Sequence, residues 1–116
     1  MDIAGKRAVI TGGGNGIGRG IAMALAEDGA AKIVIADINP TDGERTADEL
    51  RARGVDAVAR KVNVASLDEI EALADSAWER MGGVDLLFNN AGASRLARAF
   101  DISDQDIAWL IQVNIM

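Results

Sequence analysis

Four short apolar runs alternate with segments of helical periodicity along the chain. The runs occupy residues 8–10, 33–36, 57–59 and 86–88, and each is continuous rather than interrupted by polar residues. Continuous apolar runs are typical of strands covered on both faces. Strand–helix–strand units of about 30 residues predict a parallel sheet with right-handed crossovers. The pattern therefore predicts part of a doubly wound α/β fold, with about four strands and flanking helices.

Apolar stripes and end signals bound three predicted helices. The first stripe is Ile17, Ile21 and Leu25, and a weaker second one is Ala47 and Leu50. The third and clearest stripe consists of Ile70, Leu73, Ala74, Ala77, Trp78 and Met81. Helix starts are marked by Asn39-Pro40 and by a capping box at 66–69, and helix ends by Gly29, Gly54 and the glycines at 82–83.

A fourth helix is predicted from Ser103, with the apolar residues Ile107, Leu110 and Ile111 on one face. Asn114 falls next on that face, where burying its amide costs about 1–3 kcal/mol unless the amide finds partners. The alternative is that the helix frays there and Asn114 is solvated. Because a doubly wound sheet needs further strands, we expect residues 1–116 to be a single domain that forms the N-terminal part of a longer one.

Composition excludes several classes of site. The 116 residues include no Cys, His or Tyr, which removes thiolate nucleophiles and the Ser-His-Asp arrangement. The net charge of −6 argues against a nucleic-acid or anionic-membrane surface. Without a signal sequence or an apolar run of membrane length, the protein is expected to be cytoplasmic. Acids at 101, 104 and 106 fit the first turn of a helix better than a calcium loop, so no metal site is predicted.

Residues 11–18, Thr-Gly-Gly-Gly-Asn-Gly-Ile-Gly, lie between the first predicted strand and the first predicted helix. Glycines there allow a tight turn and let the backbone approach a pyrophosphate at the positive end of a helix. The competing interpretation is a flexible turn. The spacing G-x-G-x-x-G fails in every frame, and a nucleotide-triphosphatase loop fails because Arg19-Gly20 replaces its Lys and hydroxyl residue.

The spacing that does fit is T-G-x-x-x-G-x-G, and over its whole length the chain resembles the short-chain dehydrogenase/reductase family. The resemblance implies a Rossmann-type sheet that binds NAD or NADP. It also implies contacts with the cofactor from Gly12, Asn15, Gly16, Ile17 and Gly18.

Asp37 ends the second predicted strand, 19 residues after Gly18. A carboxylate at this place can accept both hydroxyls of the adenosine ribose and would repel a 2′-phosphate. The alternative is a solvated aspartate at a strand end. Neither Asn15 nor Ile38 is basic, although NADP-preferring family members often carry Arg or Lys near these places. We therefore expect NAD to be preferred over NADP, with Ile38 beside the cofactor.

Two further segments match the family. Asn63-Val64 follows the third strand, where Asp-Val is common in the family, so the resemblance implies that both residues contact the cofactor. Asn63 could still accept a hydrogen bond from the adenine amino group. Residues 89–92, Asn-Asn-Ala-Gly, match the family's N-N-A-G motif. Asn90, Ala91 and Gly92 are thereby implied as cofactor contacts, with a purely structural turn as the alternative.

The family's catalytic set is Asn-Ser-Tyr-Lys, and Asn114 matches its asparagine. These 116 residues contain no Tyr, so the family's Tyr-x-x-x-Lys pair cannot be present, and this chain alone is expected to be inactive. The resemblance implies an NAD-dependent oxidoreductase that acts on a small alcohol or ketone, as a homodimer or homotetramer. The alternative function is a non-catalytic dinucleotide-binding module that senses redox state or regulates a partner.

Overall fold

The computed structural model describes residues 2–14, 16–63 and 65–88, and strands alternate with helices throughout these ranges. The elements are β1 (Arg7–Thr11), α1 (Gly16–Glu27), β2 (Lys32–Asp37), α2 (Pro40–Ala52), β3 (Asp56–Lys61), α3 (Leu67–Met81) and β4 (Leu86–Phe88). The four predicted strands and the first three predicted helices are confirmed. The predicted fourth helix lies outside the described residues.

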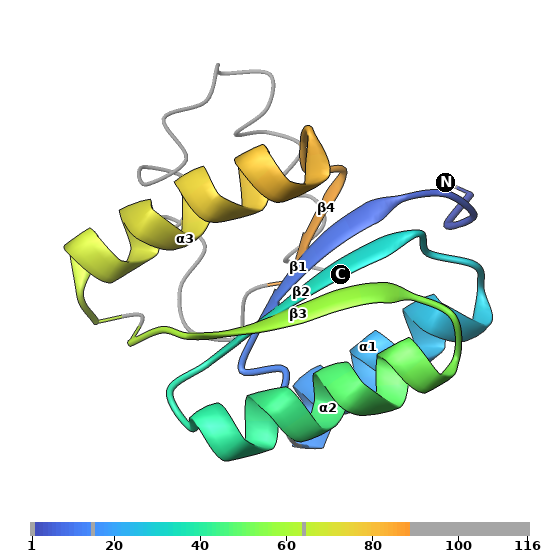
Figure 1. Ribbon diagram of the computed structural model, residues 1–116, viewed down its shortest axis with the longest axis horizontal. Coiled ribbons are helices and arrows are strands. Elements are labelled where there is room, and N and C mark those ends of the chain that lie inside the picture. Colours follow the sequence, from blue (N-terminus) through green and yellow to red (C-terminus); the bar gives the residue numbers. More distant parts are fainter. Residues whose placement is uncertain (1, 15, 64, 89–116) are drawn as a thin grey trace.

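The four strands form one parallel sheet in the order β3-β2-β1-β4. β1 is therefore central, and its Val9 is in register with Val34 of β2 and Leu87 of β4. Helices α1 and α2 cover one face of the sheet, and α3 covers the other (Figure 1). This three-layer arrangement confirms the predicted α/β class.

Successive side chains of the central strands enter two different hydrophobic clusters. Ala8 and Ile10 of β1 pack in the cluster on the α1 and α2 side, together with Leu25 and Leu50. Val9, between them, packs in the cluster on the α3 side. Because neighbouring residues of a strand point to opposite faces, a strand covered on both faces needs the continuous apolar run that the sequence contains.

The run at 57–59 is less buried than the sequence pattern predicts. Of its three residues only Ala57 is buried, while Val58 and Ala59 are partly exposed. Within the described ranges β3 pairs only with β2 and lies at the end of the sheet. β3 is covered on both faces as predicted, since Ala59 packs against the cluster on the α1 and α2 side and Val58 against the cluster on the α3 side. Its end position gives it fewer neighbours and leaves both side chains partly exposed.

The first predicted stripe is also wrong in part. Ile17 is 79% exposed and Ile21 only partly buried, whereas Gly18, Ala22 and Leu25 form the buried face of α1. The helix is thus rotated by about one residue relative to the prediction. Gly18 faces inward because α1 approaches the preceding loop so closely there that no side chain fits.

Helix α3 begins as predicted, with Ser66 as N-cap accepting a hydrogen bond from the Glu69 amide at 3.3 Å. The reciprocal half of the capping box does not form, because the Glu69 carboxylate accepts from the Asn63 amide instead, at 3.1 Å. Trp78 does not belong to the buried stripe, since it is 48% exposed. None of the helices in the described ranges has the length and apolar content that crossing a bilayer requires.

A charged cluster fastens the amino-terminal end of the sheet. Nε and one terminal nitrogen of Arg7 donate to the two carboxylate oxygens of Asp85, at 2.9 and 3.1 Å. The other terminal nitrogen donates to the carbonyl of Met81, at the end of α3. The Arg7 guanidinium, by donating these hydrogen bonds, holds the pKa of Asp85 below its usual value. The cluster joins β1, the end of α3 and the turn into β4.

Candidate cofactor-binding site

The loop after β1 and the last residue of β2 meet at the carboxyl-terminal edge of the sheet. In open α/β sheets this edge is where ligands bind. Thr11 ends β1, and its hydroxyl donates to the carbonyl of Phe88 at the end of β4, at 3.4 Å. This bond joins the carboxyl ends of β1 and β4 where the glycine loop begins, and Thr11 is also in register with Ala36 of β2.

The backbone of the glycine loop has the shape that its sequence predicts. Gly12 has a φ of 66°, in the left-handed region that favours glycine. Its amide donates to the carbonyl of Ala36 in β2, at 2.7 Å. A Cβ atom added to Gly18 would lie 2.1 Å from the carbonyl oxygen of Gly12. The loop and the first turn of α1 are thus packed backbone against backbone.

Helix α1 begins at Gly16, and the amides of a helix's first turn have no acceptors within the helix. The space around Gly16 is open, with no atom within 4 Å of an added Cβ. A helix start with an open approach of this kind suits an anionic ligand such as a diphosphate. The residues present therefore fit the group that the family resemblance implies.

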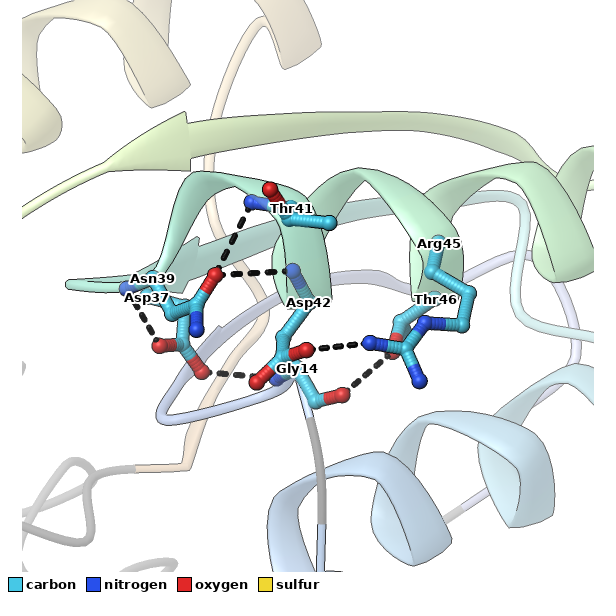
Figure 2. Close-up of polar contacts among 7 residues, drawn as sticks. All are labelled: Gly14, Asp37, Asn39, Thr41, Asp42, Arg45 and Thr46. Atoms are coloured by element: carbon cyan, nitrogen blue, oxygen red, sulfur yellow. Dashed lines mark hydrogen bonds and ion pairs between the residues drawn. The ribbon is translucent and has the colours of Figure 1, made fainter.

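Asp37 lies directly beside this loop. One of its carboxylate oxygens accepts from the Gly14 amide at 2.9 Å, and the other accepts from the Asn39 amide at 2.8 Å (Figure 2). The residue is only 9% exposed. A carboxylate has about four lone-pair sites, so each oxygen can accept a further hydrogen bond. The solvated aspartate considered from the sequence is therefore wrong.

Three contributors to this site were missed by the sequence analysis. Gly14 supplies an amide to Asp37, and its carbonyl accepts from the buried hydroxyl of Thr46 in α2 at 3.1 Å. Asn39 was predicted to open α2, which it does through hydrogen bonds to the amides of Thr41 and Asp42. Its second role, as a backbone donor to Asp37, is the contact of an Asp side chain with the amide two residues later, a local pattern that the sequence analysis did not consider.

Arg19 stands at the position where a nucleotide-triphosphatase loop would have its lysine, and it takes part in an ion pair between two helices. Its guanidinium pairs with the carboxylate of Glu49 and so links α1 to α2.

Asn63, the predicted adenine contact, follows β3 and is partly exposed. Its side-chain oxygen already accepts from the Ala65 amide at 2.9 Å. An amide oxygen can accept two hydrogen bonds, so one acceptor position is left for a ligand.

The other predicted site residues lie outside the described residues: Asn15, Val64, Asn90, Ala91, Gly92 and Asn114. In the described ranges, no group of three or more acidic side chains is placed to hold a metal ion.

The chain matches a known protein family over most of its length. Residues 6–116 match the family described as short chain dehydrogenase. The chain belongs to this family. Among curated relatives, it is 40% identical over 113 residues to the oxidoreductase UcpA of Salmonella typhimurium, an alignment covering 97% of this chain and 42% of that protein. The chain spans less than half the length of the curated relatives it matches, 42% of this one and 44% and 45% of two others.

Solved structures of two dehydrogenases show the same fold. A hydroxysteroid dehydrogenase from Escherichia coli superposes with a TM-score of 0.78 at 33% identity, covering 84% of this chain and 52% of that one. A short-chain dehydrogenase/reductase from Burkholderia phymatum in complex with NAD gives a TM-score of 0.74 at 35% identity. That match covers 97% of this chain and 44% of that one.

Proposed function

We propose that residues 1–116 form the NAD-binding half of an oxidoreductase that transfers a hydride between NAD(H) and an alcohol or carbonyl carbon. The observation that carries this proposal is the Asp37 carboxylate, fixed beside the glycine loop by two backbone amides. Membership of the short-chain dehydrogenase family supports the reaction class. The NAD complex of the Burkholderia phymatum relative supports the cofactor.

The proposed contacts follow the order of the cofactor's parts. Gly12, Gly16, Ile17 and Gly18 would hold the diphosphate at the start of α1, and Ile38, which is exposed, would flank the adenosine. Further contacts are proposed for Asn15, Asn63, Val64, Asn90, Ala91 and Gly92.

Charge supports a preference for NAD over NADP. The Asp37 carboxylate can accept the two ribose hydroxyls of NAD, whereas a 2′-phosphate would place like charges together in a nearly buried setting. Such a juxtaposition costs several kcal/mol. The neighbouring acid Asp42 is paired with Arg45 in the next turn of α2, so that cation is engaged (Figure 2).

The bound nicotinamide would supply the site that gains or loses the hydride. Among the residues of this chain, Asn114 is proposed to take part in the proton relay of the complete enzyme. The proposed substrate is a small alcohol or ketone. The proposed setting is a cytoplasmic homodimer or homotetramer.

A fluorescence titration of the protein with NADH and with NADPH tests the proposal. We expect the Kd for NADPH to exceed that for NADH by at least about tenfold, from the cost of the like charges. In Asp37→Asn, which is neutral, the Kd for NADH should rise and the difference between the two nucleotides should shrink.

The matched control is Glu44→Gln, which neutralises an exposed acid of α2 that pairs with Arg51 rather than with the loop. This variant should keep the nucleotide preference of the wild type. Absence of NADH binding by the wild type, or equal Kd values for the two nucleotides, would contradict the proposal.

A further inference from the structure

Thr46 is a polar residue at a position in α2 where an apolar side chain would be expected. It lies on the buried face of the helix with Ala47 and Leu50, and none of its surface is exposed. A buried hydroxyl without a partner is costly. In the middle of a helix, the usual partner of a Thr hydroxyl is the carbonyl three or four residues earlier in the same helix.

The hydroxyl of Thr46 instead donates outside its helix, to the carbonyl of Gly14 in the glycine loop, 32 residues earlier in the sequence. The amide of Gly14 donates at the same time to the Asp37 carboxylate. Figure 2 shows Gly14 between these two side chains, one from the end of β2 and one from the second turn of α2. Residue 14 is therefore held through both of its backbone polar groups.

The packing around Gly14 leaves little room for the loop to move closer to Asp37 or to the first turn of α2. A Cβ added at this position would lie 2.7 Å from Asp37 Oδ2 and 2.8 Å from the Cβ of Asp42. Gly14 itself is buried. Because Gly14 is already in close contact on this side, the position of its peptide groups depends on two hydrogen bonds: the one its amide donates to Asp37 and the one its carbonyl accepts from Thr46.

We propose that Thr46 is a positioning residue for nucleotide selection: by holding the Gly14 carbonyl, it keeps the Gly14 amide on Asp37 and so fixes the carboxylate for the adenosine ribose. This inference rests on the proposed NAD site. Without the hydroxyl, the loop around Gly14 shifts and the Asp37 carboxylate gains rotational freedom. The Asp37 carboxylate then binds the ribose hydroxyls less tightly, and it discriminates less strongly against a 2′-phosphate.

Hydrogen exchange of the Gly14 amide, followed by NMR in the protein without nucleotide, tests the positioning directly. We expect a protected amide in the wild type and in Thr46→Ser, which keeps the hydroxyl. In Thr46→Val, which keeps the shape and removes the donor, exchange should be at least about tenfold faster. Thr46→Ala serves as a second variant without the donor if the Val variant does not fold. An unprotected Gly14 amide in the wild type overturns the inference before any variant is made.

Titration with NADH and NADPH tests the consequence. Thr46→Val should raise the Kd for NADH by about five- to tenfold, the effect of losing one hydrogen bond. It should also lower the ratio of the Kd for NADPH to the Kd for NADH. The control is Leu50→Val, which disturbs the buried face of the same helix away from the loop and should leave that ratio unchanged. If the wild type binds NADH and Thr46→Val keeps both the ratio and the protected amide, Thr46 has no positioning role. Failure of the wild type to bind NADH contradicts the proposed function instead.

Discussion

Gly18 and Gly20 lie two residues apart in α1 and meet different surroundings. An added Cβ at Gly18 would lie 2.1 Å from the Gly12 carbonyl oxygen, while one at Gly20 would meet no atom within 4 Å. The first glycine is required by close backbone contact. The second has no such constraint and only lowers helix stability through its backbone entropy.

Alanine at these two positions should therefore have opposite effects on stability. Gly18→Ala forces the loop away from α1, and we expect a loss of about 1–3 kcal/mol together with weaker NADH binding. Gly20→Ala should raise the free energy of unfolding by about 0.5–1 kcal/mol. Urea denaturation of both variants measures the difference. Equal effects of the two substitutions would show that the close contact at Gly18 does not constrain the protein.

At the scale of elements, the residue that caps the start of α2 also contacts the candidate site. The Asn39 side-chain oxygen accepts from the amides of Thr41 and Asp42, at 3.0 and 3.1 Å. The backbone amide of the same residue donates to Asp37. One residue thus caps the start of α2 and supplies one of the two backbone amides that hold the Asp37 carboxylate.

Removing only the cap should lower stability without removing the backbone contact to Asp37. We expect Asn39→Ala to lose about 1 kcal/mol, because two amides at the start of α2 lose their acceptor. Asn39→Ser keeps a capping oxygen and should recover most of that loss. Thermal melts of the two variants provide the measurement, and a melting temperature of Asn39→Ala equal to that of the wild type would contradict the role of the cap.

The type and order of the elements could be predicted from the sequence because they depend on local patterns. Apolar runs gave the strands, and residues such as Asn39 and Gly82 marked helix ends correctly. The contacts between Thr46 and Gly14 and between Arg7 and Asp85 could not, since they join residues 32 and 78 positions apart that follow no local period. The orientation of Ile17 was missed because the fit of Gly18 against the loop, rather than hydrophobicity, rotates α1.

At the scale of the whole molecule, polar interactions of two kinds lie at opposite ends of the sheet. Arg7 and Asp85 pair at the amino-terminal end, with the Asp85 carboxylate also accepting from the Arg7 backbone amide at 2.9 Å. Asp37 and the glycine loop lie at the carboxyl-terminal end. Stability and nucleotide binding can therefore be perturbed separately.

The pH dependence of stability should report the Arg7–Asp85 pair. Because hydrogen bonds from Arg7 lower the pKa of Asp85 in the folded state, its contribution is complete above the unfolded pKa of about 4 and is lost as pH falls through the lower folded value. We expect Asp85→Asn to lose about 1–3 kcal/mol at pH 7. Chemical denaturation should show this deficit shrinking below about pH 4.

The control is Asp56→Asn, which breaks the more exposed pair between Asp56 and Arg80. Exposed pairs contribute about 0–1 kcal/mol, so this variant should differ little from the wild type at either pH. A deficit of Asp85→Asn that does not change with pH would mean that the charge of Asp85 is not what stabilises the fold.

Alternate residues of β1 face opposite sides of the sheet, and this limits insertions and deletions within the strand. Ala8 and Ile10 support the helices that carry the candidate site, whereas Val9 supports α3. Deleting or inserting one residue in β1 would exchange these two sets, sending each side chain into the wrong layer. The count of residues between Lys6 and Gly12 is thus constrained by geometry on both faces of the sheet at once, more strictly than the identity of any single apolar residue there.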